Sequence, residues 1–243
     1  MSLPTLLLRV RVFAYHGARL LFLKWPDYTF DDLAAMQDTL DGPAFQRAAQ
    51  KLAQEPEGRR LLEQRPNLGI DTVDWQTLSM LPLDTLGYNV WHHFYSNGLL
   101  KHVVLGPPKM QWGEEAEFAK ARYRATHDLR HVMLGLGVEG YEEVVLQTFQ
   151  CAQLYQNLSA LIVLLGGLKH ILMDGRWREV FSLAPKAWRV GRQARFLLHM
   201  PAEEMWTLSL EQVRADYGIV PVGRRYPVAA RHPDAGRIYD VAA

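Results

Sequence analysis

The chain has 243 residues, of which 49% are hydrophobic and 22% are charged, and its 27 basic and 26 acidic side chains give a formal net charge of +1. These values are typical of a globular protein, and they exclude a disordered chain, a collagen-like repeat and a disulfide-stabilised miniprotein. The balanced charge also argues against a nucleic-acid partner.

The amino-terminal segment is both apolar and basic, and it predicts a helix over residues 4–24. Arg9 and Arg11 interrupt the apolar run, and neither a cleavage site nor a transit-peptide composition follows. The helix over residues 1–24 suits a membrane interface, and equally a surface of the protein body or of a dimer partner. The longest other apolar run, residues 158–168, is far shorter than the ~20 residues of a membrane span. We therefore expect a soluble or peripheral protein.

Helical periodicity and capping residues predict a succession of helices, without convincing strand signals. After the first helix, the predicted helices cover residues 29–41, 42–56, 57–66, 71–82, 84–98, 114–134, 141–173, part of 177–199, and 209–218. Residues 101–112 form an irregular connector, and Gly166-Gly167 marks a candidate kink. The fold class is all-α: a single-domain bundle over residues 1–221, with two long antiparallel helices around the turn at 135–140, and an extended tail over residues 222–243.

Four polar residues near the turn at 135–140 suggest a metal site. His127 and His131 are four residues apart and share one helix face, with Asp128 at its rim. Glu143, on the following helix, is about as far from the turn as His131, so an antiparallel pair would bring the two level. Cys151 is the only cysteine, which leaves His, Asp and Glu as ligands and favours a reducing compartment. Such ligands suit Zn²⁺, with Mg²⁺, Fe²⁺ or Mn²⁺ as alternatives.

Three simpler interpretations compete with a metal site. The histidines are core residues, or they belong to a solvated polar face, or Glu143 is one of several acids in an ordinary first helical turn. A helical wheel favours the solvated face, because the apolar stripe that includes Leu129 and Val132 lies almost opposite the histidine pair.

The surroundings of the motif resemble a known family. The segment ARYRATHDLRHVMLGLGVEGYEEVVLQTFQ, residues 121–150, carries the pattern HDxxH, eleven residues, Glu. This pattern is similar to the signature of the ubiquinone (coenzyme Q) biosynthesis family, the fourth protein of the Coq series. Residues 58–68, 81–99 and 206–221 also resemble that family, and the resemblance covers about residues 27–221.

The resemblance implies an α-helical protein that acts on a polyprenylated quinone precursor, or another isoprenoid lipid, at a membrane surface. It also implies a divalent metal, usually zinc, bound by His127, Asp128, His131 and Glu143. One implied role is catalytic: C1 decarboxylation and hydroxylation of a polyprenylated hydroxybenzoate ring. The alternative role is a non-catalytic, lipid-binding scaffold for other quinone-biosynthesis proteins. A metal phosphohydrolase of the His-Asp type is a third, less favoured interpretation, because no further His and Asp in suitable helical context complete that class's pattern.

Two groups of residues would suit such a ligand. The apolar run offers a lining for the lipid tail, although a helix that is apolar all round is usually core; its candidate residues are Leu158, Leu161, Ile162 and Leu165. Tyr123 and Arg124 flank the metal motif and suit a carboxylate or phosphate head group, although an exposed helix arginine is the commoner outcome.

The remaining expectations concern location and assembly. With no transit peptide found, we expect a protein of the bacterial cytoplasm, peripheral at the inner membrane, and a homodimer. The histidines outside the motif, His92 and His93 among them, show no partner spacing and receive no predicted role.

Overall fold

The computed structural model describes residues 3–22, 30–100 and 110–237, and predictions that fall on residues 23–29, 101–109 and 238–243 lie outside the described residues. Within the described ranges the all-α fold is confirmed, and the only strand-like feature there is an isolated bridge between Thr85 and Ser209. Residue contacts divide the chain into two compact units, each assembled from three separate segments. The prediction of one domain over residues 1–221 stays a prediction.

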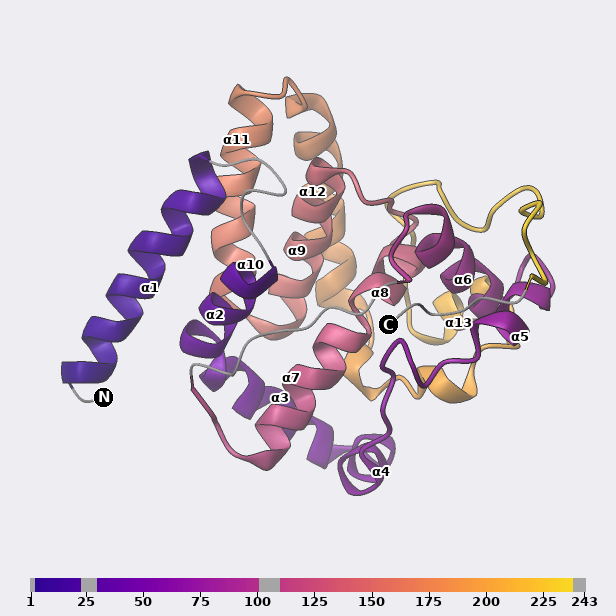
Figure 1. Cartoon of the computed structure of the whole chain (residues 1–243), viewed down its shortest axis with the longest axis horizontal. Coiled ribbons are helices and arrows are strands. Elements are labelled where there is room, and N and C mark those ends of the chain that lie inside the picture. The colour runs from indigo at the N-terminus through magenta and orange to yellow at the C-terminus, as the bar shows by residue number, and fades with distance from the viewer. Residues whose placement is uncertain (1–2, 23–29, 101–109, 238–243) are drawn as a thin grey trace. The chain divides into compact units, whose positions relative to one another are not determined.

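The first unit comprises Met1–Ala49, Val103–Glu117 and Gly140–Arg192. Its elements are α1 (Leu3–Phe22), α2 (Phe30–Leu40), the start of α3 (Gly42–Gln54), α9 (Gly140–Leu154), α10 (Asn157–Leu161), the π-helical turn η1 (Ile162–Gly166), α11 (Gly167–Leu172) and α12 (Trp177–Gln193). A short turn joins α11 to α12 (Figure 1).

The second unit comprises Gln50–His102, Phe118–Glu139 and Gln193–Ala243. Its elements are α4 (Pro56–Gln64), α5 (Trp75–Met80), α6 (Leu86–Ser96), most of α7 (Glu114–Ala125), α8 (His127–Leu134), the 3-10 turns η2 (Leu197–His199) and η3 (Ala202–Glu204), and α13 (Leu210–Asp216). Helix α6 is central to this unit, because it packs against α5, α8 and α13.

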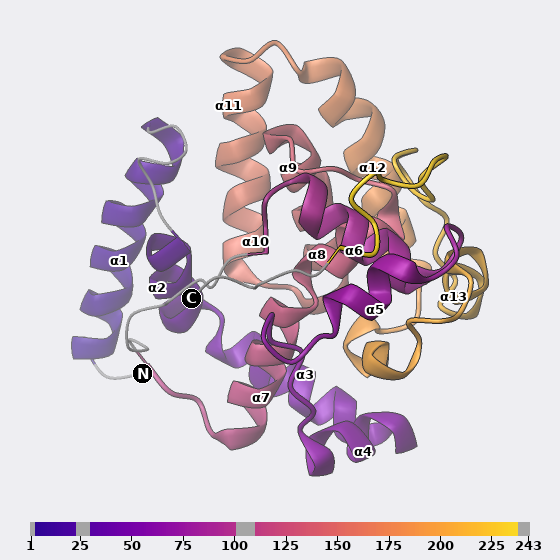
Figure 2. The same ribbon diagram turned by 45° about the vertical axis from the view of Figure 1, so that its right-hand side comes forward.

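Helix α1 packs on the first unit, against α2 and η1 (Figure 2). Asp32 of α2 joins them, since its carboxylate pairs with His16 Nδ1 at 2.7 Å and with Arg19 Nη2 at 3.2 Å. These contacts favour the interpretation of this helix as part of the protein body. None of the helices in the described part of the chain has both the length and the apolar character needed to cross a membrane.

The predicted helix over residues 114–134 is interrupted at Thr126, so the prediction of one long helix is wrong. Thr126 leaves helical geometry with φ −98° and ψ 14°, and its hydroxyl donates back to the Arg122 carbonyl. The buried Arg130 guanidinium supports the break by donating to the Tyr123 carbonyl and to Thr126 Oγ1. The Arg130 guanidinium thereby bonds polar groups on α7 and at the break itself.

The predicted helix over residues 141–173 is also divided. Helix α9 ends before Tyr155, whose φ of 51° no regular helix accommodates, and α10 begins at Asn157. The π-helical turn η1 then ends at Gly166 and α11 begins at Gly167, and the backbone of both glycines stays helical. The candidate kink therefore corresponds to a change of helix type, and the two long helices that we predicted are two series of shorter ones.

Residues 222–237 contain no helix, but this segment packs firmly on the second unit. Val222 N and Gly223 N both donate to the Leu134 carbonyl, and Arg225 N donates to that of Gly135. The segment thus supplies hydrogen-bond partners to carbonyls at the end of α8, which a helix cannot satisfy itself.

Candidate metal site

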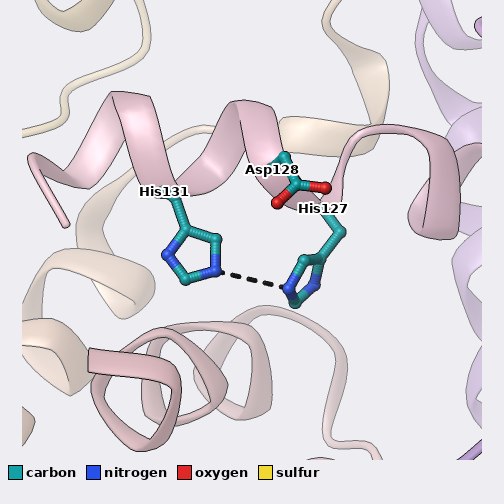
Figure 3. Close-up of side chains that lie close together, drawn as sticks. All are labelled: His127, Asp128 and His131. Carbon is teal, nitrogen blue, oxygen red and sulfur yellow. Dashed lines mark hydrogen bonds between the residues drawn. The ribbon is translucent and has the colours of Figure 1, made fainter. Parts of the chain in front are cut away.

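Three of the four predicted ligands converge on one side of α8. His127 and His131 project from neighbouring turns, and Figure 3 shows both rings leaving the same side of the helix. Each of these histidines and Asp128 offers one ligand atom, and these atoms all lie within 4.8 Å of one another. Such a cluster follows from the local sequence, because residues four apart share a helix face.

The spacing of the two imidazoles fits a metal ion. Nε2 of His127 lies 3.3 Å from Nε2 of His131. A tetrahedral zinc ion with bonds of 2.0–2.1 Å separates two ligand nitrogens by about 3.3–3.4 Å. Two ring nitrogens that face each other also need a shared proton or cation between their lone pairs.

Burial separates the competing interpretations of the histidine pair. His131 is only 2% exposed, which contradicts the solvated-face interpretation for this residue. The helical wheel misled because α8 is buried on its histidine side as well as on its apolar side, so that residues 129–134 are all buried. His127 is half-buried, and the Asp128 side chain keeps 27% of its surface exposed. The cluster therefore has a buried end at His131 and an accessible end at Asp128.

His93, which received no predicted role, contacts this cluster from α6. It is fully buried, with its ring stacked on that of His131 at a centroid distance of 5.4 Å. Its Nε2 lies 3.2 Å from Asp128 Oδ1, and its Nδ1 lies 2.8 Å from the Tyr226 hydroxyl. Only the tertiary structure joins these residues, because they are far apart in sequence.

Electrostatics at the cluster favour an ionised Asp128 carboxylate beside a neutral His93 ring. Burial lowers the pKa of His93, and the hydrogen bond with Asp128 only partly opposes this shift. Burial alone would raise the pKa of Asp128, but the hydrogen bond from His93 and the nearby histidines outweigh it and lower that pKa. The ionised form is the one in which Asp128 could serve as a ligand of a divalent cation.

Glu143, the fourth predicted ligand, belongs to the first unit. It lies in the first turn of α9, where its carboxylate accepts a hydrogen bond from Gln147 Nε2 at 2.7 Å. Ser159 Oγ of α10 in turn donates to Gln147 Oε1 at 2.7 Å. The side chain of Glu143 is thus held in place, and its role as a ligand stays a prediction.

The predicted head-group residues lie at the end of α7. Tyr123 is 4% exposed, and the guanidinium of Arg130 covers its ring at 4.6 Å from the centroid. Arg124 is half-buried. A head-group role for either residue stays a prediction.

The predicted tail-binding residues belong to an apolar cluster of the first unit. Leu158, Leu161 and Ile162 are buried there with Met36 of α2, and Leu165 packs against them. This is the arrangement that the core interpretation describes, and a lipid-binding role for these side chains stays a prediction.

Comparison with known proteins finds one family repeatedly. The sequence profile described as Coenzyme Q (ubiquinone) biosynthesis protein Coq4 matches residues 13–223. The mitochondrial ubiquinone biosynthesis protein COQ4 homolog of Xenopus tropicalis is 30% identical over 194 residues, covering 80% of this chain and 68% of that protein. The corresponding protein of Danio rerio is 29% identical over 204 residues, covering 84% and 74%. A crystal structure from Nostoc punctiforme, described as a candidate ubiquinone biosynthesis protein, shares the fold with a TM-score of 0.66 at 20% identity, covering 88% of this chain and 96% of that one.

Proposed function

Because the chain belongs to the coenzyme Q (ubiquinone) biosynthesis protein Coq4 family, which functions in ubiquinone biosynthesis, we propose that it binds a divalent metal, most simply Zn²⁺, at the α8 cluster. The observation that carries this proposal is the 3.3 Å separation of the His127 and His131 nitrogens beside an ionised Asp128. Glu143 would complete the ligand set, as the family motif implies. Mg²⁺, Fe²⁺ and Mn²⁺ are the alternative ions.

The proposed reaction is C1 decarboxylation and hydroxylation of a polyprenylated hydroxybenzoate ring. A divalent ion supplies Lewis acidity for a ring carboxylate, water or oxygen when bound. His127 and His131 would hold the ion, and the partial exposure of Asp128 leaves an approach to the cluster. A site that keeps an open coordination position would favour catalysis, and a site closed by all four proposed ligands would favour a structural role.

Elemental analysis of the purified protein tests the metal proposal. The wild type is expected to hold about one metal ion per chain after incubation with Zn²⁺ and removal of the excess. His131→Gln should hold far less metal while keeping its helical circular dichroism spectrum. His170→Gln is the matched control, because this histidine pairs with Asp174 outside the cluster. A metal-free wild type, or equal loading of wild type and His131→Gln, would refute the proposal.

The same variants distinguish the catalytic role from the scaffold role of the protein. If the protein is an enzyme, the wild type forms the decarboxylated product from a prenylated hydroxybenzoate and His131→Gln does not. A scaffold yields no product even in the wild type, yet retains prenyl-lipid binding and association with other quinone-biosynthesis proteins. Product formation that is equal in wild type and His131→Gln would show that the metal cluster is not catalytic.

We further propose that the protein contacts a membrane through an apolar surface on α11 and α12, defined by Leu168, Leu172, Met173, Trp177, Phe181 and Trp188. All six side chains are exposed, with Leu172 at 71% and Phe181 at 63%. The three aromatic residues of α12 fall within an arc of about 40° on the helix, at 100° per residue. Tryptophan and phenylalanine in such a stripe are typical of helices that lie in a bilayer interface.

The positive charge near this surface favours binding to an anionic bilayer. Residues 164–192 carry six basic and two acidic side chains, whereas the whole chain has a net charge of only +1. The basic residues are Lys169, Arg176, Arg178, Lys186, Arg189 and Arg192. At 100° per residue, Arg178 and Arg192 flank the aromatic stripe of α12, whereas Lys186 lies opposite it. Each basic residue near a bilayer surface favours anionic head groups by about 1 kcal/mol.

Co-sedimentation with vesicles tests the membrane proposal. The wild type should bind vesicles of phosphatidylglycerol and phosphatidylcholine better than pure phosphatidylcholine, and less well at high salt. The double variant Trp177→Ser/Phe181→Ser should bind roughly tenfold more weakly, since interfacial burial of these rings contributes at least about 1.5 kcal/mol. Leu7→Ser/Val10→Ser changes two exposed residues of α1 and tests that helix as the alternative contact.

The outcomes separate a membrane surface from an interface between chains. If the α12 variant binds vesicles normally but changes the sedimentation velocity of the protein, the apolar surface joins two copies and the membrane proposal fails. The homodimer and the bacterial inner-membrane location stay predictions, and the relatives named above are mitochondrial by description.

A further inference from the structure

Tyr226, His93 and Asp128 form a hydrogen-bonded chain that ends at the metal cluster. The Tyr226 hydroxyl contacts His93 Nδ1 at 2.8 Å, and His93 Nε2 contacts Asp128 Oδ1 at 3.2 Å. Tyr226 is 7% exposed and His93 is fully buried, so water competes little for these contacts. The chain thus links the irregular C-terminal segment, α6 and α8.

We infer that Tyr226 and His93 are positioning residues, which orient Asp128 and the ring of His131 for metal binding. This inference rests on the proposed metal function. It goes beyond the HDxxH motif, because neither residue belongs to it.

The protonation of Asp128 determines which atom donates and which accepts in each of these two hydrogen bonds. An ionised Asp128 can only accept, so His93 Nε2 must donate to it. In a neutral imidazole the other nitrogen then accepts, and the Tyr226 hydroxyl donates to Nδ1. The tyrosine thereby fixes which ring nitrogen of His93 carries the hydrogen. Partners outside the ligand set commonly orient metal ligands in this way.

Stacking gives His93 a second effect on the cluster. Its ring lies nearly parallel to that of His131, with an interplanar angle of 22°. The side chain of His131 is therefore restricted on the face that His93 covers. Rotation of His93 would disturb both this stack and the hydrogen bond to Asp128.

A buried arginine holds Tyr226 in register with α8. Arg214 Nη1 and Nη2 each lie 3.2 Å from the Tyr226 carbonyl oxygen, while Nε donates to Met133 O and Nη2 to Val132 O. Arg214 is 2% exposed, and it joins the end of α8 directly to the residue that contacts His93. Tyr226 is thus held by hydrogen bonds at its backbone carbonyl as well as at its hydroxyl.

The test compares two tyrosines that make the same kind of contact. Tyr226→Phe deletes the hydroxyl that begins the hydrogen-bonded series from Tyr226 through His93 to Asp128. Tyr95→Phe is the control, because the Tyr95 hydroxyl of α6 also bonds the C-terminal segment, donating at 2.8 Å to Asp234, which does not belong to the cluster. Zn²⁺ affinity is measured by competition with a chromogenic chelator, and ligand geometry by the visible absorption spectrum of the Co²⁺-loaded protein.

Tyr226→Phe should weaken Zn²⁺ binding by about tenfold, the lower end of what loss of such a partner costs, and change the Co²⁺ spectrum. Tyr95→Phe should leave both readouts within about twofold of wild type, by the same comparison. His93→Phe should weaken binding at least as much as Tyr226→Phe, and His93→Gln should recover part of the loss because its amide can donate to Asp128. Thermal unfolding of each variant shows whether it is folded.

The inference and the proposed function can fail separately. If His131→Gln abolishes Zn²⁺ binding but Tyr226→Phe and Tyr95→Phe are indistinguishable, the positioning role is refuted and the metal site stands. Equal binding by His93→Gln and His93→Phe would likewise refute the hydrogen-bonded route. A wild type that binds neither Zn²⁺ nor Co²⁺ refutes both.

Discussion

Asp41 is a buried carboxyl that caps the start of a distant helix in the first unit. Its Oδ1 accepts hydrogen bonds from the backbone nitrogens of Asn157 and Leu158 at 2.7 and 3.2 Å. Burial nevertheless raises its pKa from 3.8 to about 7, because these bonds and Arg47 offset only part of the desolvation. The folded protein therefore holds a proton here that the unfolded chain releases above about pH 4.

This shift makes stability depend on pH. Between the unfolded pKa near 4 and the folded pKa near 7, the folded state binds more protons, so stability falls as pH rises. Asp41→Asn keeps an acceptor for Asn157 and Leu158 but cannot ionise. The wild type should therefore become less stable than Asp41→Asn by a further few kcal/mol between pH 4 and pH 8, since one unit of pKa shift corresponds to about 1.4 kcal/mol. Urea denaturation at both pH values measures it, with Asp31→Asn as the control for charge; a constant difference would contradict the prediction.

Gly135 ends α8 at a position where only glycine fits. Its φ is +72°, and a Cβ there would lie 2.6 Å from the Gly223 carbonyl oxygen. Gly98 has a similar φ of +65° but open space around it. Gly98→Ala should therefore lower the unfolding free energy by only about 1–2 kcal/mol, the cost of a non-glycine residue at positive φ. Gly135→Ala should lower it clearly more, because its Cβ would also clash with the Gly223 carbonyl oxygen. Chemical denaturation of both variants checks this order, and equal losses would mean that the C-terminal segment moves aside freely.

Single residues show where inference from the sequence stops. The spacing of His127 and His131 placed them together because a helix repeats every 3.6 residues. His93 and Tyr226 have no such relation to Asp128, being 35 and 98 positions away in sequence. Their contacts depend on how α6 and the C-terminal segment pack against α8, which no local pattern records.

At the level of elements, helix interruptions were harder to predict than helices. Neither Gly nor Pro marks the break at Thr126, which the Arg130 side chain stabilises through polar contacts. The break at Tyr155 likewise carries no such residue, although its φ is 51°. Periodic apolar residues predicted the helices themselves, because burial of one face depends on repeat rather than on tertiary detail.

The attachment of α1 to α2 yields a prediction for an element. Asp32 is the acceptor shared by His16 and Arg19, and all three are at least partly buried. Asp32→Asn should weaken this attachment by about 1 kcal/mol and speed hydrogen exchange across α1, because local opening becomes easier. Asp31→Asn removes the same charge at the neighbouring, exposed position and serves as the control. Unchanged exchange in α1 would show that apolar contacts alone hold it.

At the level of the whole molecule, the fold class and the family followed from the sequence, but the two units did not. Each unit draws on three separate segments, and the chain passes between them within α3 and α7. Compositional linkers identify domains that are continuous in sequence. The crossing points inside α3, α7 and α12 carry no Gly-, Pro- or Ser-rich linker that would mark them.

The sequence prediction of an extended tail also leaves open whether that tail matters for folding. Residues 222–237 bond the end of α8, and Tyr226 is buried. Removing residues 222–243 deletes these bonds, each worth about 1 kcal/mol, together with the buried ring of Tyr226. The chain ending at residue 221 should therefore melt at least about 5 °C lower, since 1 kcal/mol shifts the melting temperature of a chain of this size by about 2–4 °C.

A shorter truncation provides the control for this experiment. Removal of residues 238–243 keeps the contacts of Tyr226 and of the α8 end described above, so its melting temperature should match that of the full chain. Zn²⁺ affinity, measured on both truncations, adds a second readout. Loss of Zn²⁺ binding only in the longer truncation is expected, because that variant lacks the hydroxyl that bonds His93. A chain ending at residue 221 with full stability and full affinity would show that α8 and His93 hold the cluster without this segment.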